Sequence, residues 1–217
     1  MRNRWFIALA AIGLHISIGS VYAWSVLTRP IMADMGFTLS QTTWTFSLAI
    51  LILGLSAGFL GSFAEKIGPK KSGLLAMLFW VTGLLGTAYA LSIHNLTLLY
   101  LFYGIIGGIG LGIGYITPVS TLVKYFPNRP GFATGLAIMG FGFASLIAGP
   151  LMQYLVAQVG LVDTFIILGV IYLVIMSASS LYLKAPQPKH PTRTTKDKST
   201  MYVHTHGMLA NDAMKTW

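Results

Sequence analysis

The stretch GIIGGIGLGIGYITP, residues 104–118, places six glycines among isoleucines and leucines. Glycine at this density is typical of loops that cradle phosphate groups, so a nucleotide-binding loop is the first alternative. The letters do not match G-x-G-x-x-G, because Ile113 stands where a glycine is needed after Gly108 and Gly110. The pattern that fits is G-x-x-x-G, which lets membrane helices approach each other closely. We therefore predict a membrane helix here and not a ligand-binding loop.

The glycines of this stretch fall on two sides of the predicted helix. One set recurs at four-residue spacing and comprises Gly104, Gly108 and Gly112. A second flank comprises Gly107, Gly110 and Gly114. We expect close packing on both sides, with Tyr115 as the residue of this stretch to test for ligand contact. Pro118 can break the helix near its end.

The composition of the whole chain agrees with a membrane protein. Of its 217 residues, 55% are hydrophobic and 9% are charged, whereas a soluble domain is about 25% charged. The net charge of +9 gathers in short loops and in the region after Leu183, so we expect no nucleic-acid partner. There is no cysteine, which removes disulfides and thiolate ligands. We expect no metal site and no cofactor.

Six apolar runs are long enough to cross a bilayer as helices, which takes about 20 residues each. The predicted spans are 5–27, 44–64, 73–92, 96–122, 131–157 and 164–183. Runs of this length exclude the strands of a membrane β-barrel. The fold class is therefore an all-α polytopic membrane protein. The basic and apolar start resembles a signal peptide, but its apolar run is too long for one, and we expect it to remain as the first span.

The loops predict an orientation in the membrane. Thirteen of the fourteen lysines and arginines lie on one side of the six spans, and Arg29 lies on the other. The positive-inside rule then places both ends of the chain in the cytoplasm, in a multi-pass protein of the cell (inner) membrane. After the bundle of residues 1–183, residues 184–208 read as a cytoplasmic linker, and LANDAMKTW, residues 209–217, reads as the start of a further helix.

The loop GSFAEKIGPKKSG, residues 61–73, resembles the signature loop of the major facilitator superfamily. The residues that fill that pattern are Gly61, Ala64, Glu65, Lys66, Gly68 and Lys70. Phe63 and Pro69 depart from it, and Glu65 and Lys66 keep its charges. The resemblance implies that this loop is a conformational switch, in which Glu65 belongs to a charge network that stabilises one state of the transport cycle.

Further motifs narrow the resemblance. MGFGFASLIAGPL, residues 139–151, is similar to the fifth-helix motif of superfamily exchangers, and Gly149 and Pro150 fill its packing end. GSVYAWSV at 19–26, IGPKK at 67–71, KYFPNRPGFATG at 124–135 and FGFA at 141–144 resemble the oxalate:formate antiporter family. That family has twelve helices, so the resemblance implies an N-terminal half whose partner is a missing six-helix half. Without it, we expect self-association.

The superfamily builds each half from two inverted three-helix repeats. FLGSFAEKIG, residues 59–68, and LMQYLVAQVG, residues 151–160, share an apolar rhythm that ends in glycine. We interpret the two segments as an echo of that internal symmetry.

His15 is the only ionisable residue other than tyrosine deep inside a predicted span. An ionisable residue inside a membrane span suggests a functional site. One interpretation is a proton- or substrate-binding role, and the other is a neutral histidine that hydrogen-bonds a neighbouring helix. Gly19 and Tyr22 share its helical face, which predicts a stripe along a cavity. Trp24 points away from Tyr22 unless the helix bends.

The resemblance implies that aromatic residues form the walls of a small-anion cage. Tyr22, Trp24, Tyr115 and Phe141 match those positions, and Gln41 and Thr43 are weaker candidates. For each aromatic residue, plain helix or lipid packing is the alternative. The spans carry no Lys or Arg at mid-depth, although a carboxylate in a dry cavity needs cations. The resemblance implies that these cations come from the second half.

Two readings of function remain. The first is a secondary active transporter that moves oxalate, formate or another monocarboxylate by alternating access, without catalysing chemistry. The second is a self-contained six-helix membrane scaffold or partner protein. The pentapeptide GLSAG, residues 54–58, matches the G-x-S-x-G pattern of hydrolases, but it lies inside a span and lacks the strand–turn–helix context that this chemistry needs.

Overall fold

The computed structural model describes residues 3–186, which form one compact unit. The expectations for the linker beyond residue 186 and for a helix at 209–217 therefore lie outside the described residues. The described part is helical, with no strand. Its elements are α1 (Arg4–Gly19), η1 (Ser20–Ala23), α2 (Trp24–Met35), α3 (Leu39–Ile67), α4 (Pro69–Ser92), α5 (Leu96–Leu99), η2 (Tyr100–Gly107), α6 (Gly108–Tyr125), α7 (Pro130–Val159) and α8 (Leu161–Tyr182).

These elements join into six helical rods, each long and apolar enough to cross a membrane. The first rod comprises α1, the 3₁₀ turn η1 and α2, and the fourth comprises α5, the π-helical segment η2 and α6. The predicted all-α fold with six spans is confirmed. The first rod runs on to Met35, beyond the predicted end at Leu27. The expected break at Pro118 is wrong, because α6 continues through this proline to Tyr125. A membrane helix tolerates the loss of the one backbone hydrogen bond that a proline removes.

Glycines on one side of α6 and η2 allow α3 to approach closely. A Cβ atom added at Gly104 would lie 2.8 Å from Leu48 Cδ2, and one added at Gly108 would lie 2.7 Å from Ile52 Cβ. At Gly112 the added atom would overlap the Ser56 hydroxyl. The predicted G-x-x-x-G face therefore packs along α3.

The second glycine flank packs on α4. A Cβ atom at Gly110 would lie 2.6 Å from the backbone nitrogen of Trp80 and 2.9 Å from the carbonyl oxygen of Ala76. One added at Gly83 of α4 would lie 2.9 Å from Gly107 Cα. Both predicted flanks of the glycine stretch are thus helix contacts, and α6 is held between α3 and α4.

The packing partners of the helices repeat under exchange of the first three rods with the last three. Helix α3 packs along α6, and α7 packs along α1. Helix α4 packs against α6, and α8 packs against α1, while α4 and α8 pack on each other. These pairs are the ones that two inverted three-helix repeats would make.

Two turns agree with this symmetry. Gly68 alone separates α3 from α4, and Gly160 alone separates α7 from α8. Gly68 has φ 82° and ψ 161°, and Gly160 has φ 84° and ψ 178°. This backbone region is essentially open to glycine alone. The two segments that end in these glycines are therefore equivalent corners of the two repeats.

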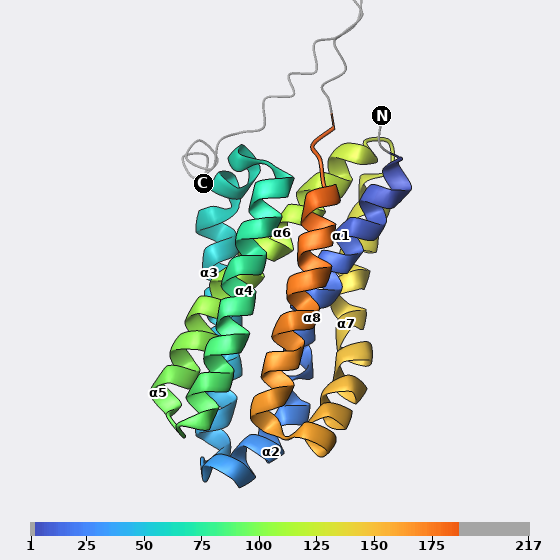
Figure 1. Ribbon diagram of the computed structural model, residues 1–217. Coiled ribbons are helices and arrows are strands. Elements are labelled where there is room, and N and C mark those ends of the chain that lie inside the picture. The colour runs from blue at the N-terminus through green and yellow to red at the C-terminus, as the bar shows by residue number, and fades with distance from the viewer. Residues whose placement is uncertain (1–2, 187–217) are drawn as a thin grey trace, which may run out of the picture. The chain divides into compact units, whose positions relative to one another are not determined.

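The basic residues of the described part gather at one end of the bundle. The start of α1, the turn at Gly68, the loop after α6 and the end of α8 lie at the top of Figure 1. These segments carry Arg4, Lys66, Lys70, Lys71, Lys124, Arg129 and Lys184. Arg29 lies in α2, at the opposite end.

Replacing Gly110 by alanine should destabilise the bundle, because the added methyl group meets the backbone of α4, which cannot swing aside. We expect a loss of about 1–3 kcal/mol, as for other overpacked sites. Gly58→Ala in α3 is the matched control, since nothing lies within 4 Å of its added Cβ and alanine favours the helix. Thermal unfolding in detergent measures both. Equal stability of the two variants would contradict the close contact of α4 and α6.

Candidate functional site

Four ring side chains from three helical rods form one group, which we call the aromatic cluster: His15, Tyr22, Tyr115 and Phe141. The Phe141 ring is its centre, 5.1 Å from Tyr22, 5.2 Å from Tyr115 and 5.7 Å from His15 between ring centroids. The contacts of Phe141 with the two tyrosines are edge-to-face. The resemblance implied that Tyr22, Tyr115 and Phe141 share one cage, and the structure adds His15 to the group.

The fifth aromatic candidate, Trp24, lies elsewhere. It is buried, its indole nitrogen donates to the carbonyl oxygen of Thr42 at 3.2 Å, and its ring lies 4.3 Å from that of Tyr103. The 3₁₀ turn η1 separates α1 from the helix that Trp24 begins. Trp24 therefore packs in the interior, against η2, and not in the aromatic cluster.

His15 is fully buried between three helices. Its Nδ1 atom lies 2.6 Å from the carbonyl oxygen of Ala137 in α7. Its Nε2 atom lies 3.0 Å from the carbonyl oxygen of Tyr115 in α6. The imidazole thus joins α1 to both helices that carry the other cluster residues, and both of its nitrogens face backbone acceptors.

The predicted stripe of His15, Gly19 and Tyr22 packs mainly on α7. A Cβ atom at Gly19 would overlap the Phe141 carbonyl oxygen and lie 2.7 Å from Ala144 Cβ. Tyr22 in contrast is 44% exposed, whereas Phe141 is 6% exposed. His15 and Gly19 therefore form a helix crossing, and the aromatic cluster reaches the surface of the bundle at Tyr22.

The two weaker candidates serve the start of α3. Gln41 forms a capping box with Thr38, in which the Gln41 backbone nitrogen donates to the Thr38 hydroxyl at 3.2 Å. The Thr43 hydroxyl donates to the carbonyl oxygen of Leu39 at 2.8 Å. Both side chains lie in local helix contacts, and the described contacts do not join them to the aromatic cluster.

A second group of polar residues lies at the basic end of the bundle. Glu65 at the end of α3 and Lys124 at the end of α6 form an ion pair of 3.3 Å, with both side chains about half exposed. Of the other switch-loop residues, Lys66 and Lys70 are exposed, and Gly68 makes the turn. The sequence placed Lys124 only among the basic loop residues, and its pairing with Glu65 was not foreseen.

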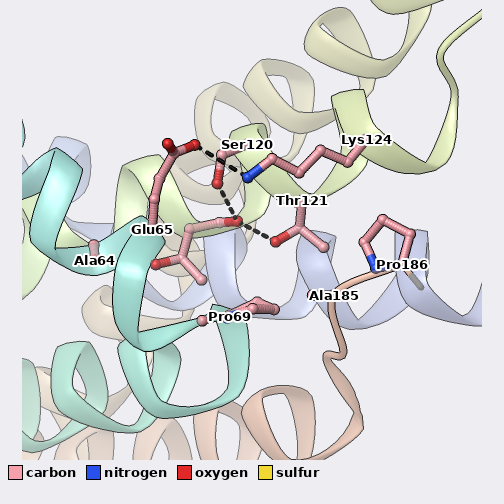
Figure 2. A pocket seen from close by; sticks show the side chains of 10 residues that line it. Ala64, Glu65, Pro69, Ser120, Thr121, Lys124, Ala185 and Pro186 are labelled. Atoms are coloured by element: carbon pink, nitrogen blue, oxygen red, sulfur yellow. Dashed lines mark hydrogen bonds and ion pairs between the residues drawn. The ribbon is translucent and has the colours of Figure 1, made fainter. Parts of the chain in front are cut away.

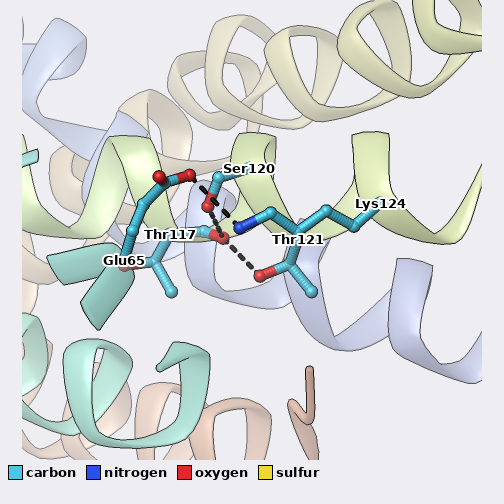
Figure 3. A network of polar contacts seen from close by, with 5 residues as sticks. All are labelled: Glu65, Thr117, Ser120, Thr121 and Lys124. Atoms are coloured by element: carbon cyan, nitrogen blue, oxygen red, sulfur yellow. Dashed lines mark hydrogen bonds and ion pairs between the residues drawn. The ribbon is translucent and has the colours of Figure 1, made fainter. Parts of the chain in front are cut away.

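Beside the ion pair lies a small pocket of about 50 Å³ between α3, α6 and the segment after α8 (Figure 2). Its lining residues are Ala64, Glu65, Gly68, Pro69, Thr117, Ser120, Thr121, Lys124, Ala185 and Pro186. The hydroxyls of Ser120 and Thr121 both donate to the carbonyl oxygen of Thr117, at 3.4 and 2.6 Å (Figure 3). The Thr117 hydroxyl also lies 2.6 Å from that of Ser72 in α4. These hydroxyls are thus held by the helices, and the ion pair is the exposed part of the group.

The remaining glycine and proline candidates contact neighbouring helices to different degrees. A Cβ atom at Gly61 would lie 2.9 Å from Ile116 Cδ1, so α3 approaches α6 closely here. At Gly149 the nearest atom would be Val26 Cγ2 at 3.8 Å, an ordinary contact. Pro150 lies within α7, which continues to Val159.

No metal site is found within residues 3–186, where no three His, Asp or Glu side chains gather as ligands would. The described part of the chain therefore offers two features that could carry function. One is the aromatic cluster with its buried imidazole, and the other is the Glu65–Lys124 pair at the end of the bundle.

The sequence of this chain is similar to those of several membrane transport proteins. The family model of the Major Facilitator Superfamily matches residues 6–214. An uncharacterized MFS-type transporter of Escherichia coli, YhjX, is 32% identical over 89% of this chain and 47% of its own length. The human monocarboxylate transporter 14 is 28% identical over 86% of the chain and 36% of its own length. The oxalate:formate antiporter of Oxalobacter formigenes is 26% identical over 85% of the chain and 43% of its own length.

The chain spans less than half the length of each of these three relatives. The family match nevertheless covers nearly all of the sequence, including both candidate features. Six membrane-crossing helices in two inverted triplets agree with it. The chain belongs to the Major Facilitator Superfamily.

Proposed function

We propose that this chain is the N-terminal half of a secondary transporter, not an enzyme, which moves a small organic anion across a membrane by alternating access. Oxalate, formate and other monocarboxylates are the anions that we favour. Two of the relatives support this class by name, since one is a monocarboxylate transporter and another an oxalate:formate antiporter. Their identities of 28% and 26% are low, so the argument rests on the site.

The observation that carries the proposal is the aromatic cluster. Ring edges carry partial positive charge and phenol hydroxyls donate hydrogen bonds, so edges and hydroxyls suit an anion better than ring faces do. The cluster opens to the bundle surface at Tyr22, with Phe141 behind it and Tyr115 beside Phe141. A small carboxylate would bind at this opening, between the bundle and whatever covers it.

A second six-helix half is the cover that we propose. Large apolar side chains are exposed on α3 and α7, including Phe59 at 80% and Leu146 at 69%. In a membrane such side chains face lipid or another helix bundle. Basic residues of that second half would supply the cations which a dry carboxylate site needs. Self-association through the same faces is the alternative that a chain without this partner would show.

We further propose that the basic end of the bundle faces the cytoplasm of a cell (inner) membrane. One end of the described part carries more arginines and lysines than the other, and the positive-inside rule places the end with more of them in the cytoplasm. The Glu65–Lys124 pair then lies at the cytoplasmic boundary and joins α3 to α6. We propose that the switch loop biases the bundle toward the conformation described here through this pair.

Removing the Tyr115 hydroxyl should weaken carboxylate exchange. A hydrogen bond to a charged group is worth about 1.5–3 kcal/mol, so Tyr115→Phe and Tyr22→Phe should each reduce exchange about tenfold or more. The full-length protein is reconstituted into liposomes, and exchange of radiolabelled oxalate, formate and lactate is followed. Tyr154→Phe, at an exposed tyrosine of α7 outside the cluster, is the control.

Exchange of any of the three anions that depends on the cluster tyrosines and not on Tyr154 would support the proposal. A correctly folded full-length protein that exchanges no small carboxylate would contradict the proposed function and favour the scaffold alternative. Equal losses in all three tyrosine variants would remove the aromatic cluster as the binding site.

Breaking the ion pair should slow exchange without unfolding the bundle. An exposed pair contributes about 0–1 kcal/mol to stability, so Glu65→Gln and Lys124→Gln should lower the unfolding temperature little. Because both variants break one interaction, the double variant should exchange no more slowly than either single variant. Lys71→Gln, at an exposed lysine of the same end, is the control. Fully additive effects on the exchange rate would show that the two residues act independently.

A further inference from the structure

We propose that His15 is held as a doubly protonated imidazolium in this conformation, and that its buried positive charge draws the carboxylate of the substrate to the aromatic cluster. The ligand named here rests on the proposed function. The protonation of His15 rests only on the geometry around the ring.

The contacts of the two ring nitrogens favour the cation. Nδ1 faces the carbonyl oxygen of Ala137 at 2.6 Å, and Nε2 faces that of Tyr115 at 3.0 Å. A carbonyl oxygen can only accept a hydrogen bond, and a neutral imidazole has one N–H group and one bare nitrogen. Either neutral tautomer would therefore press a lone pair against a carbonyl oxygen. The imidazolium donates to both.

Aromatic rings support the charge from the sides. The Tyr115 ring stacks on the imidazole, with centroids 5.6 Å apart and planes 25° apart. The Phe141 ring lies 5.7 Å away on a second helix. Cations are stabilised over aromatic faces within about 6 Å. Two carbonyl oxygens and two rings together recover part of the cost of removing the ion from water.

No carboxylate of the described residues neutralises this charge. Asp34, Glu65 and Asp163 each lie in the first or last turn of a helix, away from the middle of the spans. Helix α6 presents Tyr115 as its titratable group beside His15, and α7 presents Phe141 and the Ala137 carbonyl. The imidazolium is therefore a cation whose counter-charge has to come from a ligand or from a partner.

The other helix against α1 does not change this balance. The titratable tyrosines of α8 are Tyr172, which lies beside Ser20, and Tyr182, whose ring packs on Phe6 at the far end of α1. Neither tyrosine brings a carboxylate to the imidazole.

The charge acts on the anion from a distance. His15 is 0% exposed and both nitrogens are engaged, so it is a positioning residue that does not touch the substrate. Its effect reaches the opening at Tyr22 through Phe141, in a site of low dielectric where a unit charge is felt strongly. The missing mid-depth cation of this half is thus His15, and the class of ligand it selects is a small monoanion or dianion of a carboxylic acid.

The protonation state of His15 can be measured directly. The chain has five histidines, and replacing His94, His190, His204 and His206 by glutamine in the full-length protein leaves His15 alone in this part of it. Histidine labelled with ¹⁵N is incorporated, and solid-state NMR in lipid bilayers at pH 7 distinguishes protonated from bare ring nitrogens. Two protonated nitrogens are expected. One protonated and one bare nitrogen in this spectrum would overturn the proposal.

The effect on the ligand is tested by binding of oxalate, formate and lactate against pH. His15→Gln is expected to weaken binding about tenfold or more and to remove the loss of affinity that follows deprotonation of His15. His15→Lys is expected to restore affinity, because it restores the charge. His94→Gln, outside the spans, is the matched control. If affinity and its pH profile are the same in His15→Gln and wild type, the charge has no role in binding.

The two sets of results separate this inference from the proposed function. Carboxylate exchange with a neutral His15 would overturn the inference alone. A protonated His15 in a protein that exchanges no carboxylate would overturn the proposed function and, with it, the ligand named here. If His15→Gln does not fold, the NMR spectrum of the protein with His15 intact still decides the protonation.

Discussion

Helix α6 approaches two neighbours at once because glycines line both of its sides, and the site depends on this approach. Without Cβ atoms at Gly108 and Gly110, the backbones of α3 and α4 come close enough to fix the depth and rotation of α6. That rotation sets where the Tyr115 ring lies and where its carbonyl oxygen points. Both groups meet His15 on α1. A packing feature that binds no ligand thus determines the geometry of the aromatic cluster.

The sequence predicts the fold well because membrane spans are governed by length and hydropathy, which are local properties. Six helices, both glycine flanks of α6 and the two similar segments that end in Gly68 and Gly160 could be predicted from the sequence. Local irregularities of the helices could not be predicted. The 3₁₀ turn Ser20–Ala23, which contains Tyr22 and directly precedes Trp24, has no signal in the residue pattern, and neither has the π-helical segment Tyr100–Gly107.

The residues of the candidate site could be predicted from the sequence, but most of their contacts could not. The family resemblance grouped Tyr22, Tyr115 and Phe141, but the contacts of His15 with the residues of α6 and α7 depend on packing between distant parts of the chain. The two carbonyl oxygens that face His15 lie 122 and 100 residues away in the sequence. They belong to backbone, which carries no residue-specific signal. The pairing of Glu65 with Lys124, 59 residues apart, is hidden for the same reason.

The one-residue corners at Gly68 and Gly160 limit how this bundle can deform. Each glycine holds a backbone conformation that other residues do not adopt, and a single residue leaves no slack between the helices on either side. Each of the pairs α3–α4 and α7–α8 is therefore joined by a tight corner and not by a flexible loop. The Gly68 corner lies at the basic end, and the Gly160 corner lies at the opposite end (Figure 1). Widening at the basic end therefore cannot occur between α3 and α4, and widening at the opposite end cannot occur between α7 and α8.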